Sequence, residues 1–167
     1  MKKLTLLAQM LVSVCLPGCG QQAFDKQLEL LYKHTVPLVQ PTALAQELKQ
    51  NIPPVLLDVR SGAEYKVSHL PGAIFLDYES FTLDQVRNIP LQSPVVVYCS
   101  VGVRSEKIGE QLLRAGYTKV RNVYGGIFKW KNAGLPVVRH PNIPTDSVHV
   151  YNRYWGTWLT NGVKVYE

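Results

Sequence analysis

A single cysteine, Cys99, has the sequence surroundings of a nucleophile. It follows the apolar, β-branched run 95–98, which is typical of a buried parallel strand, and it precedes a short glycine-containing loop. Residues 105–115 then show helical spacing. Backbone N–H groups at a helix N-terminus stabilise an anion, and Arg104 adds a fixed positive charge. We therefore expect the pKa of the Cys99 thiol to fall from about 8.5 to roughly 3.5–7.5, which would make it a reactive thiolate.

The alternative interpretation is that Cys99 is an inert, buried cysteine at a strand end. The combination of strand, cysteine, glycine-containing loop, arginine and helix favours the reactive interpretation. The loop that supplies these backbone N–H groups consists of Ser100, Val101, Gly102, Val103 and Arg104, and Ser105 begins the predicted helix.

The first 18 residues have the pattern of a bacterial lipoprotein signal peptide. Lys2 and Lys3 precede a mostly apolar run over residues 4–16, which is too short to span a bilayer comfortably. The sequence Leu-Pro-Gly-Cys at residues 16–19 resembles a lipobox, in which cleavage before Cys19 leaves a lipidated N-terminus. An ordinary cleaved signal or an uncleaved anchor is the alternative. We expect an exported lipoprotein that is attached to a membrane by acyl chains and faces the periplasm or the cell exterior.

The cysteine count agrees with a reactive Cys99. The three cysteines are Cys15, Cys19 and Cys99. Cys15 would leave with the signal peptide and Cys19 would carry lipid, so Cys99 would be the remaining thiol. Exported proteins usually pair their cysteines, and an unpaired thiol there is either buried or reactive.

Length and charge exclude few functions. The chain has 167 residues, enough for one domain with a substantial core, and a formal net charge of +6. Loss of Lys2 and Lys3 with the signal peptide would leave +4. No block of Lys or Arg is present, so the sequence does not indicate nucleic-acid binding.

Strand-like and helix-like segments alternate between residues 36 and 139. The predicted strands cover residues 36–39, 55–59, 74–76, 95–98 and 120–123. This alternation predicts a doubly wound α/β domain, a parallel sheet with helices on both faces. The carboxyl ends of parallel strands share one edge, so Asp58 and Cys99 should lie at the same edge.

Asp58 and Arg60 are unusual in an apolar segment, since a buried carboxylate needs hydrogen-bond donors. They could pair with each other, brace the cysteine loop or touch substrate, and we favour bracing. His69 has no second histidine or cysteine at ligand spacing, so no metal site is expected.

Two segments flank the predicted domain. Residues 19–35 are predicted to form a tether and a short amphipathic helix, with an apolar stripe at Phe24, Leu28, Leu31 and Tyr32 that packs on the domain. Residues 140–167 form an extension rich in tyrosine and tryptophan. The favoured interpretation is an arm that pins aromatic side chains onto the domain, and the alternative is a lid or partner surface beside the site.

Three stretches together resemble a single-domain rhodanese: LLDVRSGAEYKVSHLPGAIFL, VVVYCSVGVRSEKIGEQLLRAGY and VRNVYGGIFKW. The resemblance covers about residues 36–139. It implies the rhodanese α/β fold with a five-stranded parallel sheet. It also implies that Cys99 cycles through a persulfide, that the loop from Ser100 to Ser105 cradles an anionic substrate, and that Asp58 and Arg60 lie near that loop.

The implied activity is sulfur transfer. The Cys99 thiolate would take the outer sulfur of thiosulfate or a similar small anionic donor and pass it to a thiol or to cyanide. No cofactor is expected.

Two alternatives stay open at this stage. A Cys-loop phosphatase or arsenate reductase uses Cys-x5-Arg to wrap a tetrahedral oxyanion, whereas here four residues separate Cys99 from Arg104. The other alternative is a non-catalytic, lipid-tethered binding module.

Overall fold

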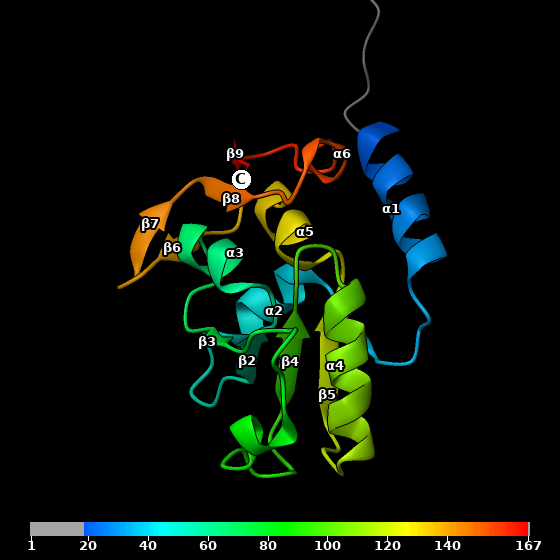
Figure 1. Ribbon diagram of the computed structural model, residues 1–167, viewed down its shortest axis with the longest axis vertical. Coiled ribbons are helices and arrows are strands. Elements are labelled where there is room, and N and C mark those ends of the chain that lie inside the picture. The colour runs from blue at the N-terminus through cyan, green and yellow to red at the C-terminus, as the bar shows by residue number, and fades with distance from the viewer. Residues whose placement is uncertain (1–18, 167) are drawn as a thin grey trace, which may run out of the picture.

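The computed structural model describes residues 19–166, and helices and strands alternate along the chain (Figure 1). The central elements are β1 (Leu38–Val39), α2 (Pro41–Glu47), β2 (Val55–Asp58), α3 (Gly62–Val67), β3 (Ile74–Phe75), the 3-10 helix η1 (Leu83–Val86), β4 (Val95–Tyr98), α4 (Val103–Arg114), β5 (Val120–Val123) and α5 (Gly126–Asn132). The signal peptide predicted at residues 1–18 lies outside the described residues.

One sheet of five parallel strands organises the domain, in the order β1-β5-β4-β2-β3. The middle strand is β4, and all of its residues are buried. A central strand covered on both faces needs apolar side chains on both sides, which is why its sequence is a continuous apolar run. The predicted five-stranded parallel sheet is therefore confirmed.

Helices cover the two faces of the sheet with separate apolar layers. Leu44 of α2 and Ile127 of α5 pack in one layer, together with Val96 of β4. Ile108 of α4 packs in the other layer with Val97. Successive strand residues point to opposite faces, so β4 contributes to both layers. The prediction of helices on both faces is confirmed.

Segments on either side of the central domain cover the carboxyl edge of the sheet (Figure 1). They are α1 (Cys19–Leu31) before the domain and, after it, β6 (Val137–Arg139), β7 (Ile143–Thr145), β8 (Ser147–His149), α6 (Arg153–Gly156) and β9 (Val163–Val165). We call residues 140–167 the C-terminal arm. Phe24 of α1 stacks on Trp158 of this arm with ring centroids 5.3 Å apart. The two flanking segments therefore pack on each other as well as on the domain.

The apolar stripe predicted for the N-terminal helix does pack on the domain. Phe24, Leu28 and Tyr32 are buried, and Leu31 is half-buried. All helices within residues 19–166 are too short or too polar to cross a lipid bilayer.

Several predicted boundaries differ from the structure by one or two residues. The strands predicted at residues 36–39, 55–59 and 74–76 are observed at Leu38–Val39, Val55–Asp58 and Ile74–Phe75. Helix α4 begins at Val103, two residues before the predicted start at Ser105. Gly102 has a φ of 101° and ends the loop in a left-handed conformation, so the next residue can enter the helix. Residues 83–86 form one 3-10 turn.

Candidate active site

Cys99 lies directly after β4, at the carboxyl edge of the sheet, and its side chain is buried. The backbone N–H of Gly102 donates to Cys99 Sγ at 3.1 Å. The first turn of α4 follows at once, so the sulfur lies against a helix N-terminus. Backbone N–H groups and the positive end of the helix dipole both favour a negatively charged sulfur here.

Two side chains hold the backbone of the loop around Cys99 by hydrogen bonds. The Tyr32 hydroxyl donates to the carbonyl of Val101 at 2.6 Å and accepts the N–H of Gly125 at 2.8 Å. The Asn122 amide donates to the carbonyl of Gly102 at 2.8 Å. A Cβ at Gly102 would collide with the Tyr32 hydroxyl, so this position requires glycine for close approach as well as for its positive φ.

The surroundings of the Cys99 thiol favour its ionised form. Burial raises its pKa, but the positive charge of Arg104 and hydrogen bonds from Ser105 and the backbone of Val101 act in the opposite direction. The net effect lowers the pKa of Cys99 below that of an ordinary cysteine. Charge and oriented donors thus outweigh desolvation at this sulfur.

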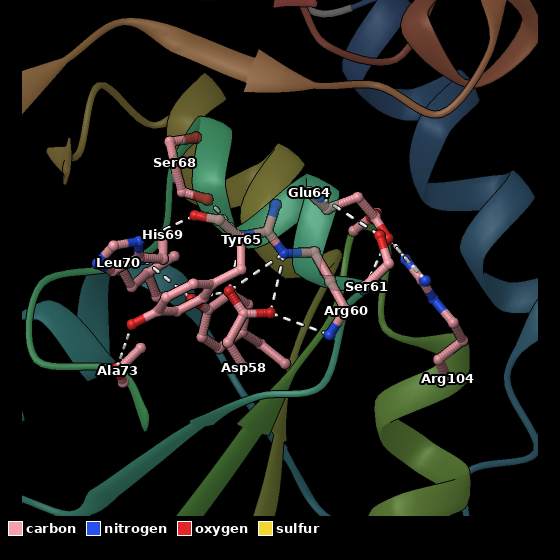
Figure 2. A network of polar contacts seen from close by, with 12 residues as sticks. Asp58, Arg60, Ser61, Glu64, Tyr65, Ser68, His69, Leu70, Ala73 and Arg104 are labelled. Carbon is pink, nitrogen blue, oxygen red and sulfur yellow. Dashed lines mark hydrogen bonds and ion pairs between the residues drawn. The ribbon is translucent and has the colours of Figure 1, made fainter. Parts of the chain in front are cut away.

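Glu64 of α3 fixes the arginine beside the cysteine. Its carboxylate accepts two hydrogen bonds from the Arg104 guanidinium, at 2.8 and 2.7 Å, and one from the Ser100 hydroxyl at 2.6 Å (Figure 2). Burial raises the pKa of Glu64, but the hydrogen bonds and charge of Arg104, with help from Arg60 and Ser100, lower it to about 2. The carboxylate is therefore ionised at neutral pH and holds Arg104 in one orientation.

Glu64 was not among the site residues predicted from the sequence. The sequence indicates its spacing three residues after Ser61, and the structure confirms that capping box. A capping box is enough to account for a glutamate at this position, so the sequence pattern does not indicate that Glu64 also contacts Arg104.

Asp58 and Arg60 pair with each other in full burial. Arg60 Nη2 lies 2.6 Å from Asp58 Oδ2, and the Tyr98 hydroxyl donates to the same oxygen (Figure 2). Arg60 also donates to the carbonyl of Ser68, and the N–H of Leu70 donates to the Tyr98 hydroxyl at 3.0 Å. The network joins β2, β4 and the segment after α3.

This network acts on the cysteine only through the backbone. Its hydrogen bonds involve Tyr98, the residue before Cys99, and none of them reaches Sγ. The Arg60 guanidinium also lies 5.7 Å from the centre of the Tyr98 ring. Of the three roles considered for Asp58 and Arg60, the geometry supports pairing with each other and an indirect brace of the loop.

A pocket of about 320 Å³ opens above Cys99. Its walls are Leu31, Glu79, Cys99, Ser100, Val101, Val103, Arg104, Tyr151 and Trp155. Tyr151 and Trp155 belong to the C-terminal arm, and Leu31 belongs to α1. Trp155 and Trp158 pack against the core, as favoured from the sequence, whereas Tyr151, Tyr154 and Tyr166 are exposed. Because Tyr151 and Trp155 line the pocket, the arm lies beside the site.

The predicted residues of the cysteine loop divide into those that line the pocket and those that face the interior. Cys99, Ser100, Val101, Val103 and Arg104 line the pocket. The other predicted loop residues face the interior, where the Gly102 N–H points at Sγ and the buried Ser105 hydroxyl donates to Asn122 at 2.7 Å.

The remaining predicted residues lie away from the pocket. Asp58 and Arg60 are in the buried network, and Cys19, the predicted lipidation site, is the first residue of α1. Within residues 19–166, no three His, Cys, Asp or Glu side chains are grouped so as to hold a metal ion.

Sequence comparisons find relatives for the central domain. The family model of the rhodanese-like domain matches residues 41–133. A protein named sulfurtransferase from Allochromatium vinosum is 34% identical over 96 residues, covering 58% of this chain and 89% of the relative. A thiosulfate sulfurtransferase, GlpE, from Actinobacillus pleuropneumoniae is 37% identical over 95 residues, covering 56% of this chain and 85% of the relative.

Solved structures agree with this similarity. A rhodanese-like domain protein from Staphylococcus aureus is 26% identical with a TM-score of 0.51, covering 56% of this chain and 90% of that chain. A thiosulfate sulfurtransferase from Pseudomonas aeruginosa has a TM-score of 0.59 at 23% identity, covering 74% of this chain and 24% of that one, which bears on the fold alone. The family match includes Cys99 and its loop but leaves out α1 and the C-terminal arm.

Proposed function

Because the chain belongs to the family of rhodanese-like domains, we propose that it is a sulfurtransferase that works through a persulfide on Cys99. The observation that carries this proposal is the position of Cys99 Sγ, which receives the Gly102 N–H at the start of α4 and forms part of the wall of a pocket beside Arg104. The sulfur donor is thiosulfate or a similar sulfane-sulfur compound, and the acceptor is a thiol or cyanide.

The first half-reaction loads sulfur onto the enzyme. The Cys99 thiolate attacks the outer sulfur of thiosulfate, a new S–S bond forms, and the S–S bond of thiosulfate breaks. Sulfite leaves with the electron pair of that bond. The lowered pKa of Cys99 raises the share of the thiolate, which is the nucleophilic form. Donors in the loop stabilise the resulting persulfide anion.

The second half-reaction unloads the sulfur. Cyanide attacks the outer sulfur of the persulfide, thiocyanate departs, and the Cys99 thiolate is regenerated. With a thiol acceptor, the sulfur moves to that thiol as a new persulfide. Because the donor product leaves before the acceptor reacts, the kinetics should be ping-pong, with parallel double-reciprocal plots. Intersecting plots would argue against a free persulfide intermediate.

Intact-mass spectrometry of the purified full chain tests the proposal. Treatment with thiosulfate or another sulfane-sulfur donor should add one sulfur atom, cyanide should remove it, and a Cys99→Ser variant should gain none. If no donor adds sulfur to the folded protein, the enzymatic proposal is wrong, and a non-catalytic binding module becomes the better explanation.

Phosphoryl or arsenate chemistry has less support at this site. Four residues separate Cys99 from Arg104, fewer than in the Cys-x5-Arg loop of that class. Arg104 is also engaged by the Glu64 carboxylate, so its guanidinium is not free to bind a second oxyanion in a bidentate manner.

We also propose that the protein is an exported lipoprotein anchored through Cys19, because residues 16–19 resemble a lipobox. In this arrangement the catalytic domain faces the periplasm or the cell exterior. A Cys19→Ala variant should move from the membrane fraction to the soluble fraction or keep its uncleaved signal peptide. Unchanged membrane association with a cleaved N-terminus would contradict lipid anchoring.

A further inference from the structure

The pocket over Cys99 has mostly apolar walls. Leu31 comes from α1, Val101 and Val103 from the cysteine loop and the start of α4, and Tyr151 and Trp155 from the C-terminal arm. Such walls favour a ligand with an apolar body, since burial of apolar surface stabilises by about 25 cal/mol per Å². Aromatic walls add specific ring contacts.

The charges at the pocket do not match an inorganic dianion. Among the residues that line it, Arg104 carries the one positive charge, and this charge is neutralised by two hydrogen bonds to Glu64. Glu79 lines the same pocket and adds a negative charge. A dianion such as thiosulfate must lose water on entry and finds no free cation in compensation. A monoanion meets weaker repulsion from Glu79 and from the thiolate.

The size of the pocket allows for a body larger than a bare sulfur oxyanion. At about 320 Å³, its volume is at the lower end of the range usual for small-molecule sites. Cys99, Tyr151 and Trp155 all line this one space. A carrier can therefore present its sulfane sulfur to Cys99 while its apolar body contacts the arm.

We propose that this pocket selects organic sulfur carriers with an apolar body and at most one negative charge, in preference to inorganic thiosulfate. This inference rests on the proposed function, because it assumes that Cys99 accepts sulfane sulfur. The specificity-determining residues are Leu31, Tyr151 and Trp155, which lie outside the matched family domain, and Glu79 within it.

Benzenethiosulfonate is a suitable probe because it differs from thiosulfate by a phenyl ring in place of one charged oxygen. The Cys99 thiolate attacks its terminal sulfur, the new S–S bond forms, and benzenesulfinate leaves with the electron pair of the broken S–S bond. The reaction parallels that with thiosulfate, in which sulfite leaves. Both loading rates can be followed on the full chain by intact-mass spectrometry.

The decisive quantity is the ratio of the loading rate constant for benzenethiosulfonate to that for thiosulfate. Comparing this ratio between variants cancels the intrinsic reactivity of the two donors. Tyr151→Ala and Leu31→Ala should each lower the ratio, roughly three- to tenfold for the aromatic residue. Tyr166→Ala and Leu30→Ala are matched controls, because both residues are exposed and neither lines the pocket. The controls should leave the ratio unchanged.

Removal of the negative charge of Glu79 tests separately whether repulsion disfavours the dianion. Glu79→Gln should speed loading by the thiosulfate dianion more than by the monoanion, and the difference should shrink at high salt. Because Glu79 and Tyr151 are exposed, neither change threatens the fold.

The outcomes separate this inference from the proposed function. If both donors load Cys99 but Tyr151→Ala, Leu31→Ala and Glu79→Gln all leave the ratio unchanged, the selectivity proposal is overturned and the sulfurtransferase proposal stands. If neither donor loads Cys99, the proposed function itself fails.

Discussion

At the scale of single residues, the ionisation of Cys99 decides reactivity. Its pKa is lowered mainly by the charge of Arg104, against the effect of burial. We expect the alkylation rate of Cys99 by iodoacetamide to rise with pH and to level off with a midpoint below that of a free cysteine, which is about 8.5. Arg104→Gln should move that midpoint upwards, whereas Arg114→Gln, an exposed change at the far end of α4, should not. A wild-type midpoint at or above the free-cysteine value of about 8.5 would refute the activated thiolate.

Glu64 links the site to acid stability. Its pKa is lowered from 4.5 to about 2, so its ionised form stabilises the folded state above pH 4.5. That contribution should disappear as the pH falls from 4.5 towards 2. We expect Glu64→Gln to lower the free energy of unfolding by roughly 2–3 kcal/mol at pH 7 and to make it less dependent on pH in the acid range.

Urea unfolding at a series of pH values measures this linkage. Glu29→Gln is the control, since its side chain is 61% exposed. Parallel stability curves for wild type and Glu64→Gln between pH 2 and 4.5 would show that the Glu64 carboxylate contributes nothing to acid stability.

At the scale of elements, α1 and the residues after it support the cysteine loop. Tyr32 follows α1, and its hydroxyl joins the carbonyl of Val101 to the N–H of Gly125. Tyr32→Phe keeps the ring but leaves both buried groups without this partner, which costs about 1–3 kcal/mol per unsatisfied group. We expect slower sulfur loading of Cys99 together with an altered alkylation midpoint, because the loop donors no longer hold their positions.

The Tyr124→Phe variant separates loop positioning from general docking of the helix. The Tyr124 hydroxyl donates to Asp25 of α1 at 2.8 Å, whereas the Tyr32 hydroxyl bonds the loop itself. Tyr124→Phe should change the free energy of unfolding slightly and leave the sulfur-loading rate and the alkylation midpoint of Cys99 unaltered. Equal effects of the two variants on loading would mean that Tyr32 acts only by anchoring α1.

Most elements of the sheet could be predicted because the relevant information is local. Most strands of the sheet are short, largely apolar runs, of which β4 is the clearest. Cys99, Ser100, Val101 and Arg104 are close neighbours in sequence, so their convergence follows from one strand-loop-helix unit. The sequence pattern predicts the start of α4 two residues late, because the pattern carries no sign that Gly102 is left-handed and ends the loop.

The rest of the site depends on contacts between distant segments. Glu64 reaches Arg104 across 40 residues, and Tyr32 reaches Val101 across 69. Tyr151 and Trp155 come from the arm, whose composition indicated packing but not which aromatic residues would face the cysteine. Local patterns carry no information on such pairings, so the predicted site lacked these four residues.

At the scale of the whole molecule, the C-terminal arm is part of the folded unit. Val148, Val150 and Leu159 of the arm are buried in the same apolar layer as α2 and α5. Because the arm also lines the pocket, the complete site needs residues on both sides of the matched region 41–133. Loss of packing in the arm should therefore reduce both stability and substrate selection.

Leu159→Ala tests whether the arm and the domain fold together. Leu159 is 1% exposed, so its truncation should cost about 2–5 kcal/mol of unfolding free energy, through lost burial and the cavity that remains. Ile143→Ala, at a 45% exposed position in the same arm, should change stability by no more than about 0.5 kcal/mol. Urea unfolding followed by tryptophan fluorescence and by circular dichroism should give one coincident transition in both variants. Two separate transitions, or equal costs for the two changes, would mean that the arm folds independently of the domain and that its wall of the pocket is not fixed by the core.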